Sequence, residues 1–172
     1  MKIIFLDIDG VLNHERFYKE RHIKKNKTFD NLPHRFSQID PECVQNLNSL
    51  CKDTQAKIVI SSTWRSDGIE QCRNALEFHK FKGEILDITP NLRSDNCLRG
   101  NEILTWVKDN EALVGPYYQF TEYVILDDDS DMLYWQRNNF LLIDRFVGLT
   151  MGNVFQAKKI LNNGKILNSN EL

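Results

Sequence analysis

The sequence predicts an α/β fold built on a mainly parallel β-sheet, and three observations support this prediction. Apolar segments of strand length recur along the chain, at 3–6, 57–60, 84–88, 123–126 and 140–143. The second and fourth segments, Lys-Ile-Val-Ile and Tyr-Val-Ile-Leu, lack polar alternation, which is typical of strands that are buried on both faces. Segments of helical length lie between the strands, and this alternation predicts βαβ units with right-handed crossovers.

Helix signals separate the expected strands. Asp40 and Pro41 form an N-cap and first-turn pair at the start of one helix. Asp67 and Glu70 resemble a capping pair for the next helix. Further helices are expected at 100–110, 130–138 and 153–162.

The composition fits one globular domain over residues 1–172. Of the 172 residues, 41% are hydrophobic and 27% are charged, and the net charge of −2 implies no polyelectrolyte partner for the chain as a whole. The cysteines Cys43, Cys51, Cys72 and Cys97 lack CxxC spacing, which disfavours a zinc site, and they are too sparse in a chain of this size for a disulfide scaffold. No apolar run reaches the roughly 20 residues of a membrane span, and no signal peptide is recognised. We therefore expect a cytoplasmic protein with reduced thiols.

The segment 13–39 interrupts the alternation of strands and helices. It is polar and basic without clear periodicity, so we expect a long loop or a small insertion. With Phe17, Tyr18 and Phe29 beside its basic residues, the segment suits contacts with RNA phosphates and bases, and the alternative is an ordinary solvated surface. The basic residues are Arg16, Lys19, Arg21, Lys24, Lys25 and Lys27.

Polar residues follow three of the expected strands at the point where each strand ends. Asp7 and Asp9 follow the first strand, Ser-Ser-Thr-Trp-Arg65 follows the second, and the acidic run 127–131 follows the fourth. In a parallel sheet these ends lie along one edge. Carboxylates that meet there need a hard cation, and oxygen ligands suit Mg²⁺. A metal among carboxylates, with hydroxyl and guanidinium donors nearby, is typical of phosphoryl transfer.

These motifs resemble the haloacid dehalogenase (HAD) superfamily over nearly the whole chain. The resemblance rests on Asp7-Ile-Asp9-Gly-Val-Leu, on an apolar strand that ends in serine, and on another that ends in Asp-Asp. A narrower resemblance, to the HAD domains of Swiss Army Knife RNA-repair proteins, rests on Ile-Ser-Ser-Thr-Trp-Arg65, Arg99-Gly-Asn-Glu-Ile-Leu-Thr-Trp106, Leu-Asp-Asp-Asp and Gly148-Leu-Thr150. It implies a three-layer α/β/α sandwich with a Rossmann-like sheet and a minimal cap.

The resemblance also assigns roles to the residues at the strand ends. It implies that Asp7 is the nucleophile and forms an aspartyl-phosphate, and that Asp9 is the general acid and then the general base. Ser61 is the expected donor to the phosphoryl oxygens. Ser62 replaces it if the strand ends one residue later. Trp64 is expected to be a core residue.

The expected metal and cation complete this site. The resemblance implies that Mg²⁺ is bound by Asp7, the Asp9 backbone carbonyl, Asp127 and Asp128, with Asp131 orienting them. The family also places a cation, usually lysine, beside the phosphoryl group. Arg99 is the first choice because a guanidinium binds phosphate bidentately. The alternatives are Arg65, Arg93 and Lys108.

The resemblance therefore implies Mg²⁺-dependent hydrolysis of phosphate monoesters. A minimal cap leaves the site open to a macromolecule, and an RNA end is the first expected substrate. A phosphoprotein, including one with phosphotyrosine, is the next. A phosphotransferase and a catalytically inactive HAD-fold binding module are the alternatives from other classes. The presence of Asp7, Asp9, Ser61 and Asp127 together argues against the inactive module.

Overall fold

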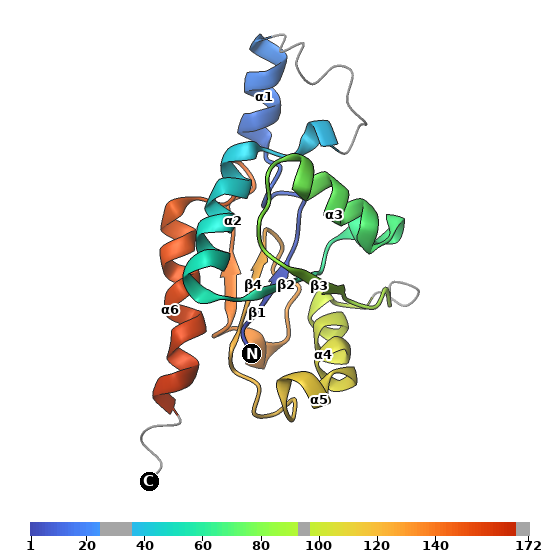
Figure 1. Ribbon diagram of the computed structural model, residues 1–172, viewed down its shortest axis with the longest axis vertical. Helices are drawn as coiled ribbons and strands as arrows, with labels where there is room; N and C mark the ends of the chain where they lie inside the picture. Colours follow the sequence, from blue (N-terminus) through green and yellow to red (C-terminus); the bar gives the residue numbers. More distant parts are fainter. Residues whose placement is uncertain (25–35, 93–96, 168–172) are drawn as a thin grey trace.

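Five parallel strands form one sheet at the centre of the computed structural model, which describes residues 1–24, 36–92 and 97–167 (Figure 1). The sheet order is β3-β2-β1-β4-β5. The strands are β1 Ile3–Leu6, β2 Lys57–Ile60, β3 Ile85–Ile88, β4 Tyr123–Asp127 and β5 Phe140–Leu142. The five predicted strands are confirmed, each to within one residue at either end.

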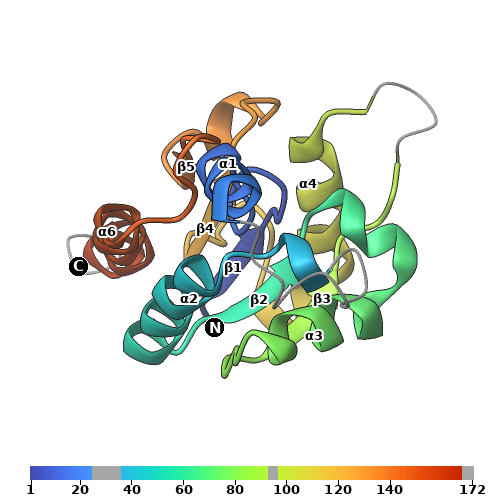
Figure 2. The same cartoon turned by 90° about the horizontal axis from the view of Figure 1, so that it is seen from above.

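Helices cover both faces of this sheet (Figure 2). Helices α2, α3 and α6 pack on one face, and α4 and α5 pack on the other, so the predicted three-layer sandwich is confirmed. The helices are α1 Glu15–Lys24, α2 Pro41–Thr54, α3 Ile69–Phe78, α4 Arg99–Asp109, α5 Glu111–Val114 and α6 Met151–Leu167. Short 3₁₀ helices are η2 Phe36–Gln38, η3 Thr63–Asp67 and η5 Tyr134–Gln136. Among the described residues, none of these helices is both long and apolar enough to cross a membrane.

The central strand β1 contributes to both cores. Ile4 and Leu6 pack in the core shared with α2, α3 and α6, whereas Ile3 and Phe5 pack toward α4, and all four are fully buried. The ring of Phe5 contacts Trp106 of α4 edge-on, with a centroid separation of 5.4 Å. Because successive side chains of a strand point to opposite faces, Asp7, which follows Leu6, is directed to the α4 side of the sheet.

Of the two predicted helix caps, one is confirmed and the other is wrong. The Asp40 side chain accepts a hydrogen bond of 2.8 Å from the Glu42 N–H, so the predicted cap of α2 is confirmed. The predicted capping pair of α3 is wrong, because Asp67 ends η3 and Gly68, with a φ of +89°, takes the cap position.

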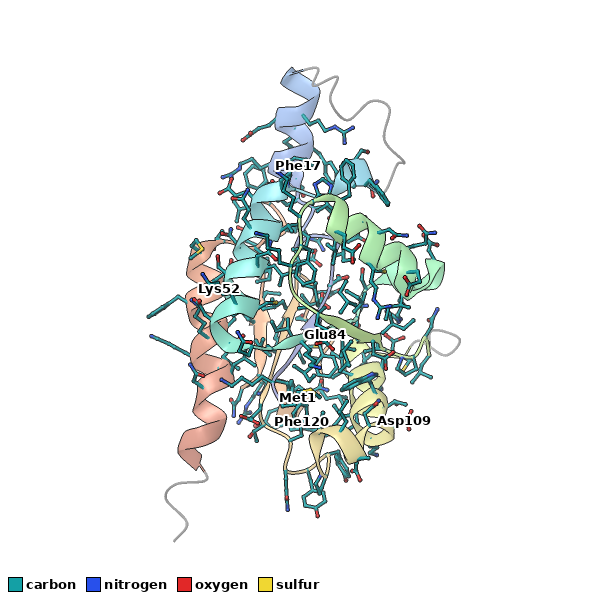
Figure 3. All side chains as sticks on the ribbon, in the orientation of Figure 1. Met1, Phe17, Lys52, Glu84, Asp109 and Phe120 are labelled. Atoms are coloured by element: carbon teal, nitrogen blue, oxygen red, sulfur yellow. The ribbon has the colours of Figure 1, made fainter. Side chains whose placement is uncertain are left out.

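One further expectation was wrong. The expected helix at 130–138 is reduced to the 3₁₀ helix η5, because the backbone before it has other partners: the Asp131 carbonyl accepts from the Gly100 N–H at 3.2 Å, and the Leu133 N–H donates to the Gln136 side chain at 2.8 Å. The segment 13–39, expected to be a long loop or a small insertion, contains helix α1, which projects from one end of the molecule (Figure 1). Phe17 lies where this helix meets the body of the molecule (Figure 3). Two exposed ion pairs within α1 add a small stabilisation to this helix.

Candidate active site

The strand register brings the ends of β1, β2 and β4 to the same level. Leu6 pairs with Ile60 on one side and with Leu126 on the other. Beyond these pairs, the Asp7 N–H donates to the Leu126 carbonyl at 2.9 Å, and the Ser61 N–H donates to the Leu6 carbonyl at 2.8 Å. The polar residues after the three strands therefore lie next to one another, as the sequence predicted.

Three carboxylates form the centre of this site. Oxygens of Asp7, Asp127 and Asp128 all lie within 4.8 Å of one another. Asp7 and Asp127 are only 5% and 1% exposed, and Oδ2 of Asp127 is buried without a hydrogen-bond donor among the described residues. Gly10 allows this close approach, because a Cβ atom there would lie 2.3 Å from the Asp128 carboxylate, and its φ of +73° also favours glycine.

The charges of the two buried carboxylates, Asp7 and Asp127, are poorly compensated. Burial raises the pKa of Asp7 to about 6, although the nearby Arg99 guanidinium and a hydrogen bond with the Ser62 side chain both lower it. Burial, followed by the neighbouring charge of Asp7, raises the pKa of Asp127 to about 8. A buried, oxygen-rich and electron-rich cluster of this kind fits a hard divalent cation, which would keep both groups ionised.

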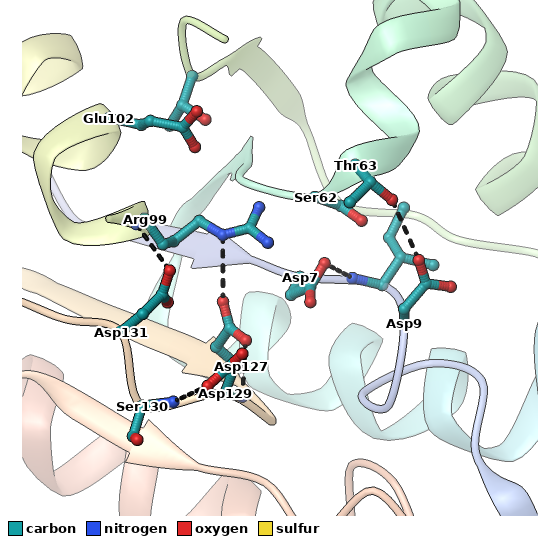
Figure 4. Close-up of polar contacts among 12 residues, drawn as sticks. Asp7, Asp9, Ser62, Thr63, Arg99, Glu102, Asp127, Asp129, Ser130 and Asp131 are labelled. Carbon is teal, nitrogen blue, oxygen red and sulfur yellow. Dashed lines mark hydrogen bonds and ion pairs between the residues drawn. The ribbon is translucent and has the colours of Figure 1, made fainter. Parts of the chain in front are cut away.

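Two cations reach these carboxylates: Arg145 pairs with Asp128 at 2.8 Å from an exposed position, and Arg99 lies largely buried beside Asp127. Arg99 is the first residue of α4, and its Nε lies 3.6 Å from Oδ2 of Asp127. Its guanidinium lies between Asp127 and Asp7 (Figure 4). Nη1 of Arg99 is buried and donates no hydrogen bond within the described part of the chain, so it is available to an anion. The Asp131 carboxylate accepts from the Arg99 N–H at 2.9 Å, so Asp131 fixes the start of α4.

The other described candidate cations, Arg65 and Lys108, contact other groups of the protein. The Arg65 guanidinium is buried, where Nη2 lies 2.6 Å from the Glu102 carboxylate and Nη1 donates to the Ser62 carbonyl at 2.7 Å. A substrate phosphate would have to displace these partners, so the assignment of Arg65 to phosphate binding is corrected. Lys108 lies in the last turn of α4, with its ammonium 4.9 Å from the centre of the Tyr117 ring. Arg93 lies outside the described residues.

The serine after β2 that contacts the carboxylates is Ser62. Its side chain makes a hydrogen bond with Asp7 that lowers the pKa of that group. The hydroxyl of Ser61 is fully buried and has no hydrogen-bond partner in the part of the chain that the structure describes. Because β2 ends at Ile60 as expected, Ser61 remains a candidate donor to the phosphoryl oxygens beside Ser62.

Asp9 lies beside this cluster with an exposed carboxylate that accepts three hydrogen bonds. Oδ1 accepts from Nδ2 of Asn13 at 2.7 Å and from the indole Nε1 of Trp64 at 3.0 Å. Oδ2 accepts from the Thr63 hydroxyl at 3.2 Å. The prediction that Trp64 is a core residue is confirmed, since it is 3% exposed. Its contact with Asp9 was missed, although a buried indole N–H usually has a hydrogen-bond partner.

Several of the described basic residues of 13–39 make ion pairs or hydrogen bonds within the protein. Arg16 pairs with Glu20 at 3.6 Å and Lys19 pairs with Glu15 at 3.2 Å, while Arg21 donates to the Ser37 carbonyl. Phe17 packs near the buried His14 ring, with centroids 6.1 Å apart. Lys25, Lys27 and Phe29 lie outside the described residues, and Lys24 ends α1.

Comparison with known proteins identifies the family. No curated protein and no solved structure matches the chain. A family model described as the HAD domain in Swiss Army Knife RNA repair proteins matches residues 3–154. The match includes all five strands and every residue of the carboxylate cluster. The chain therefore belongs to the HAD domain family of Swiss Army Knife RNA repair proteins.

Proposed function

We propose that this protein is a Mg²⁺-dependent phosphatase that hydrolyses phosphate monoesters through an aspartyl-phosphate on Asp7. Membership of the HAD family indicates phosphatase-type chemistry. The observation that carries the proposal is the pairing of a buried carboxylate, Asp7, with a second one, Asp127, beside the arginine Arg99. Such a site attracts both a cation and a phosphoryl group.

The residues present fit a magnesium ion. Asp7, Asp127 and Asp128 would hold it, together with the backbone carbonyl of Asp9. The buried Oδ2 of Asp127, which accepts no hydrogen bond within the described residues, is an oxygen that such an ion would satisfy. When bound, Mg²⁺ would neutralise the charge that gathers on the phosphoryl oxygens.

The two catalytic carboxylates would act in two steps. In the first, an Asp7 oxygen attacks phosphorus, the ester P–O bond breaks, and Asp9 gives its proton to the departing oxygen. In the second, water attacks the phosphoryl group, Asp9 takes a proton from that water, and the bond from Asp7 to phosphorus breaks. Inorganic phosphate leaves, with Asp7 ionised and Asp9 protonated as at the start. Arg99 and Ser62 would hold the phosphoryl oxygens throughout.

An RNA end is the substrate that we favour. The matching family model is described from RNA repair proteins. The Asp9 carboxylate, which would face the departing group, is exposed, and this suits an ester on a large molecule. A phosphoprotein would meet the same requirement and is the second candidate substrate. If the phosphoryl group passed to an acceptor other than water, the enzyme would be a phosphotransferase.

An assay on a phosphate monoester tests the reaction class. We expect the wild-type protein to release inorganic phosphate with Mg²⁺ present, to lose this activity in EDTA, and to regain it when Mg²⁺ is restored in excess. Release that continues unchanged in EDTA would contradict the metal-dependent mechanism.

A further inference from the structure

The two oxygens of the Asp9 carboxylate have different surroundings. Oδ1 accepts from Asn13 and Trp64, at 2.7 and 3.0 Å, whereas Oδ2 accepts only a longer bond of 3.2 Å from Thr63 among the contacts within the described chain. The orientation of the Asn13 amide follows from its other contact, because its Oδ1 accepts from the Gly10 N–H at 2.8 Å. Its NH₂ group must therefore face Asp9.

This asymmetry decides which oxygen can exchange a proton. Indole and amide N–H groups are donors only, so Oδ1 cannot carry a proton while both contacts persist. A hydroxyl is both a donor and an acceptor, so the contact with Thr63 is compatible with either state of Oδ2. A proton passing to or from Asp9 therefore passes through Oδ2.

The donors to Asp9 are themselves held in place by the fold. Trp64 is 3% exposed and packs in the core shared with α2, α3 and α6, so the direction of its N–H is set by the core. Both Trp64 and Thr63 belong to η3, whose first turn is capped by the Ser62 side chain. The turn that supplies a hydroxyl to Asp7 thus also orients Asp9.

We propose that Trp64, assisted by Thr63, is a positioning residue that fixes the Asp9 carboxylate with Oδ2 toward the departing ester oxygen. The inference rests on the proposed phosphatase function. In the step concerned, the proton on Oδ2 moves to the ester oxygen as its bond to phosphorus breaks. A carboxylate that rotates freely would deliver this proton less often, because the reacting atoms must be aligned.

The variant Trp64→Phe tests this role, because it removes the N–H and keeps an aromatic ring. We would measure kcat/KM, which reports the steps up to phosphoryl transfer, on an alkyl phosphate and on p-nitrophenyl phosphate. An alkoxide needs a proton to leave, whereas nitrophenolate does not. We expect a loss of roughly 10- to 100-fold on the alkyl phosphate, part of the ~10²–10⁴-fold that a general acid supplies, and a loss below about threefold on the nitrophenyl ester.

Trp106→Phe is the matched control. Trp106 is equally buried, at 2% exposed, and its indole N–H donates to the Asp87 carboxylate at 2.7 Å, away from Asp9. We expect this variant to lose thermal stability without changing the ratio of the two kcat/KM values. An unchanged ratio in Trp64→Phe, or an equal change in both variants, would overturn the proposal.

Thr63→Val provides a second test if Trp64→Phe does not fold. Thr63 is only partly buried, so the substitution should leave the core intact. We expect the same selective loss on the alkyl phosphate, smaller than for Trp64→Phe, and recovery in Thr63→Ser, which restores the hydroxyl. Equal losses on both substrates would contradict the positioning role. A wild-type protein that hydrolyses neither substrate would instead refute the phosphatase function itself.

Discussion

At the scale of single residues, the site contains buried carboxylates that lower the stability of the fold and that the proposed reaction requires. Asp7 and Asp127 are buried beside each other, and burial raises the pKa of both. Arg99 offsets only part of this cost, since its Nε lies 3.6 Å from Asp127. Two properties of the protein should depend directly on this arrangement, the pH dependence of its stability and its affinity for a phosphoryl group.

The stability of the metal-free protein should fall as the pH rises. The folded-state pKa values, about 6 for Asp7 and about 8 for Asp127, lie above the ordinary value of 3.8, so the folded state binds more protons than the unfolded state in this range. These groups therefore destabilise the fold progressively from about pH 4 to about pH 8. We expect the Tm in EDTA to decrease from pH 5 to pH 8, and Mg²⁺ to raise it more at pH 8.

The variant Asp127→Asn separates this effect from other titrating groups. It removes one buried charge and keeps the shape of the side chain, so the decrease in Tm between pH 5 and pH 8 should become shallower. A slope equal to that of the wild-type protein would show that this carboxylate does not carry the effect.

Arg99 should be required for phosphoryl transfer. Its guanidinium lies beside the carboxylates (Figure 4), and its buried Nη1 has no hydrogen-bond acceptor in the described chain, so Arg99→Met would remove a donor to the phosphoryl group. We expect kcat/KM to fall about 10²-fold or more, as when one preorganised donor is lost. Lys108→Met is the matched control from the same helix and should retain wild-type activity. Equal activities of the two variants would contradict the assignment of Arg99.

Some residues of the site could be predicted from the sequence and others could not, for physical reasons. Asp7 and Asp127 were predictable because each follows a strongly apolar strand, and parallel strands end at one edge. The choice between Ser61 and Ser62 depended on the turn after β2, which apolar periodicity does not describe. The contact of Trp64 with Asp9 was missed, because it depends on the direction in which η3 holds the indole, and apolar periodicity does not describe that turn.

At the scale of elements, a buried ion pair joins the turn after β2 to α4. Arg65 bridges the Ser62 carbonyl and the Glu102 carboxylate, which also accepts from the Leu92 N–H at 3.0 Å. Glu102 lies one turn along α4 from Arg99, so the pair fixes the helix that supplies the cation relative to the turn that supplies Ser62.

Breaking this pair should destabilise the protein strongly. Glu102→Gln would leave a buried guanidinium uncompensated, and we expect a loss of about 3–5 kcal/mol in the free energy of unfolding, measured with urea. Glu70→Gln removes a carboxylate from an exposed pair with Arg73 and should cost less than about 1 kcal/mol. A similar small cost for both variants would show that the buried pair is not important for stability.

The elements themselves were predicted best where burial determines the pattern. The apolar strands and the capped helix α2 were predicted closely, because each signal is local. Helix α1 was missed because its polar sequence lacks the apolar stripe by which a helix is recognised. The helix expected at 130–138 was wrong because the backbone of Asp131 and Leu133 bonds to Gly100 and to the Gln136 side chain, contacts that are not visible in the local pattern.

At the scale of the whole molecule, the sandwich holds the site at the edge of the sheet from which α1 projects (Figure 1). Asp9 is exposed at this edge, which suits an ester on a large molecule. We expect a 5′- or 3′-phosphorylated RNA oligonucleotide to be hydrolysed with a higher kcat/KM than a phosphotyrosine peptide. Rates on the unphosphorylated oligonucleotide give the background. A preference for the peptide would make a phosphoprotein the first proposed substrate and an RNA end the second. The catalytic residues would stay the same.

The variant Asp7→Asn tests whether Asp7 is the nucleophile. The measurement is the release of inorganic phosphate from one monoester, with Mg²⁺, by wild-type and variant proteins at equal concentration. We predict activity in the wild-type protein and none in Asp7→Asn, which should fold with at least the wild-type Tm in EDTA because a buried charge is removed. Phosphate release by a folded Asp7→Asn protein at the wild-type rate would contradict the account.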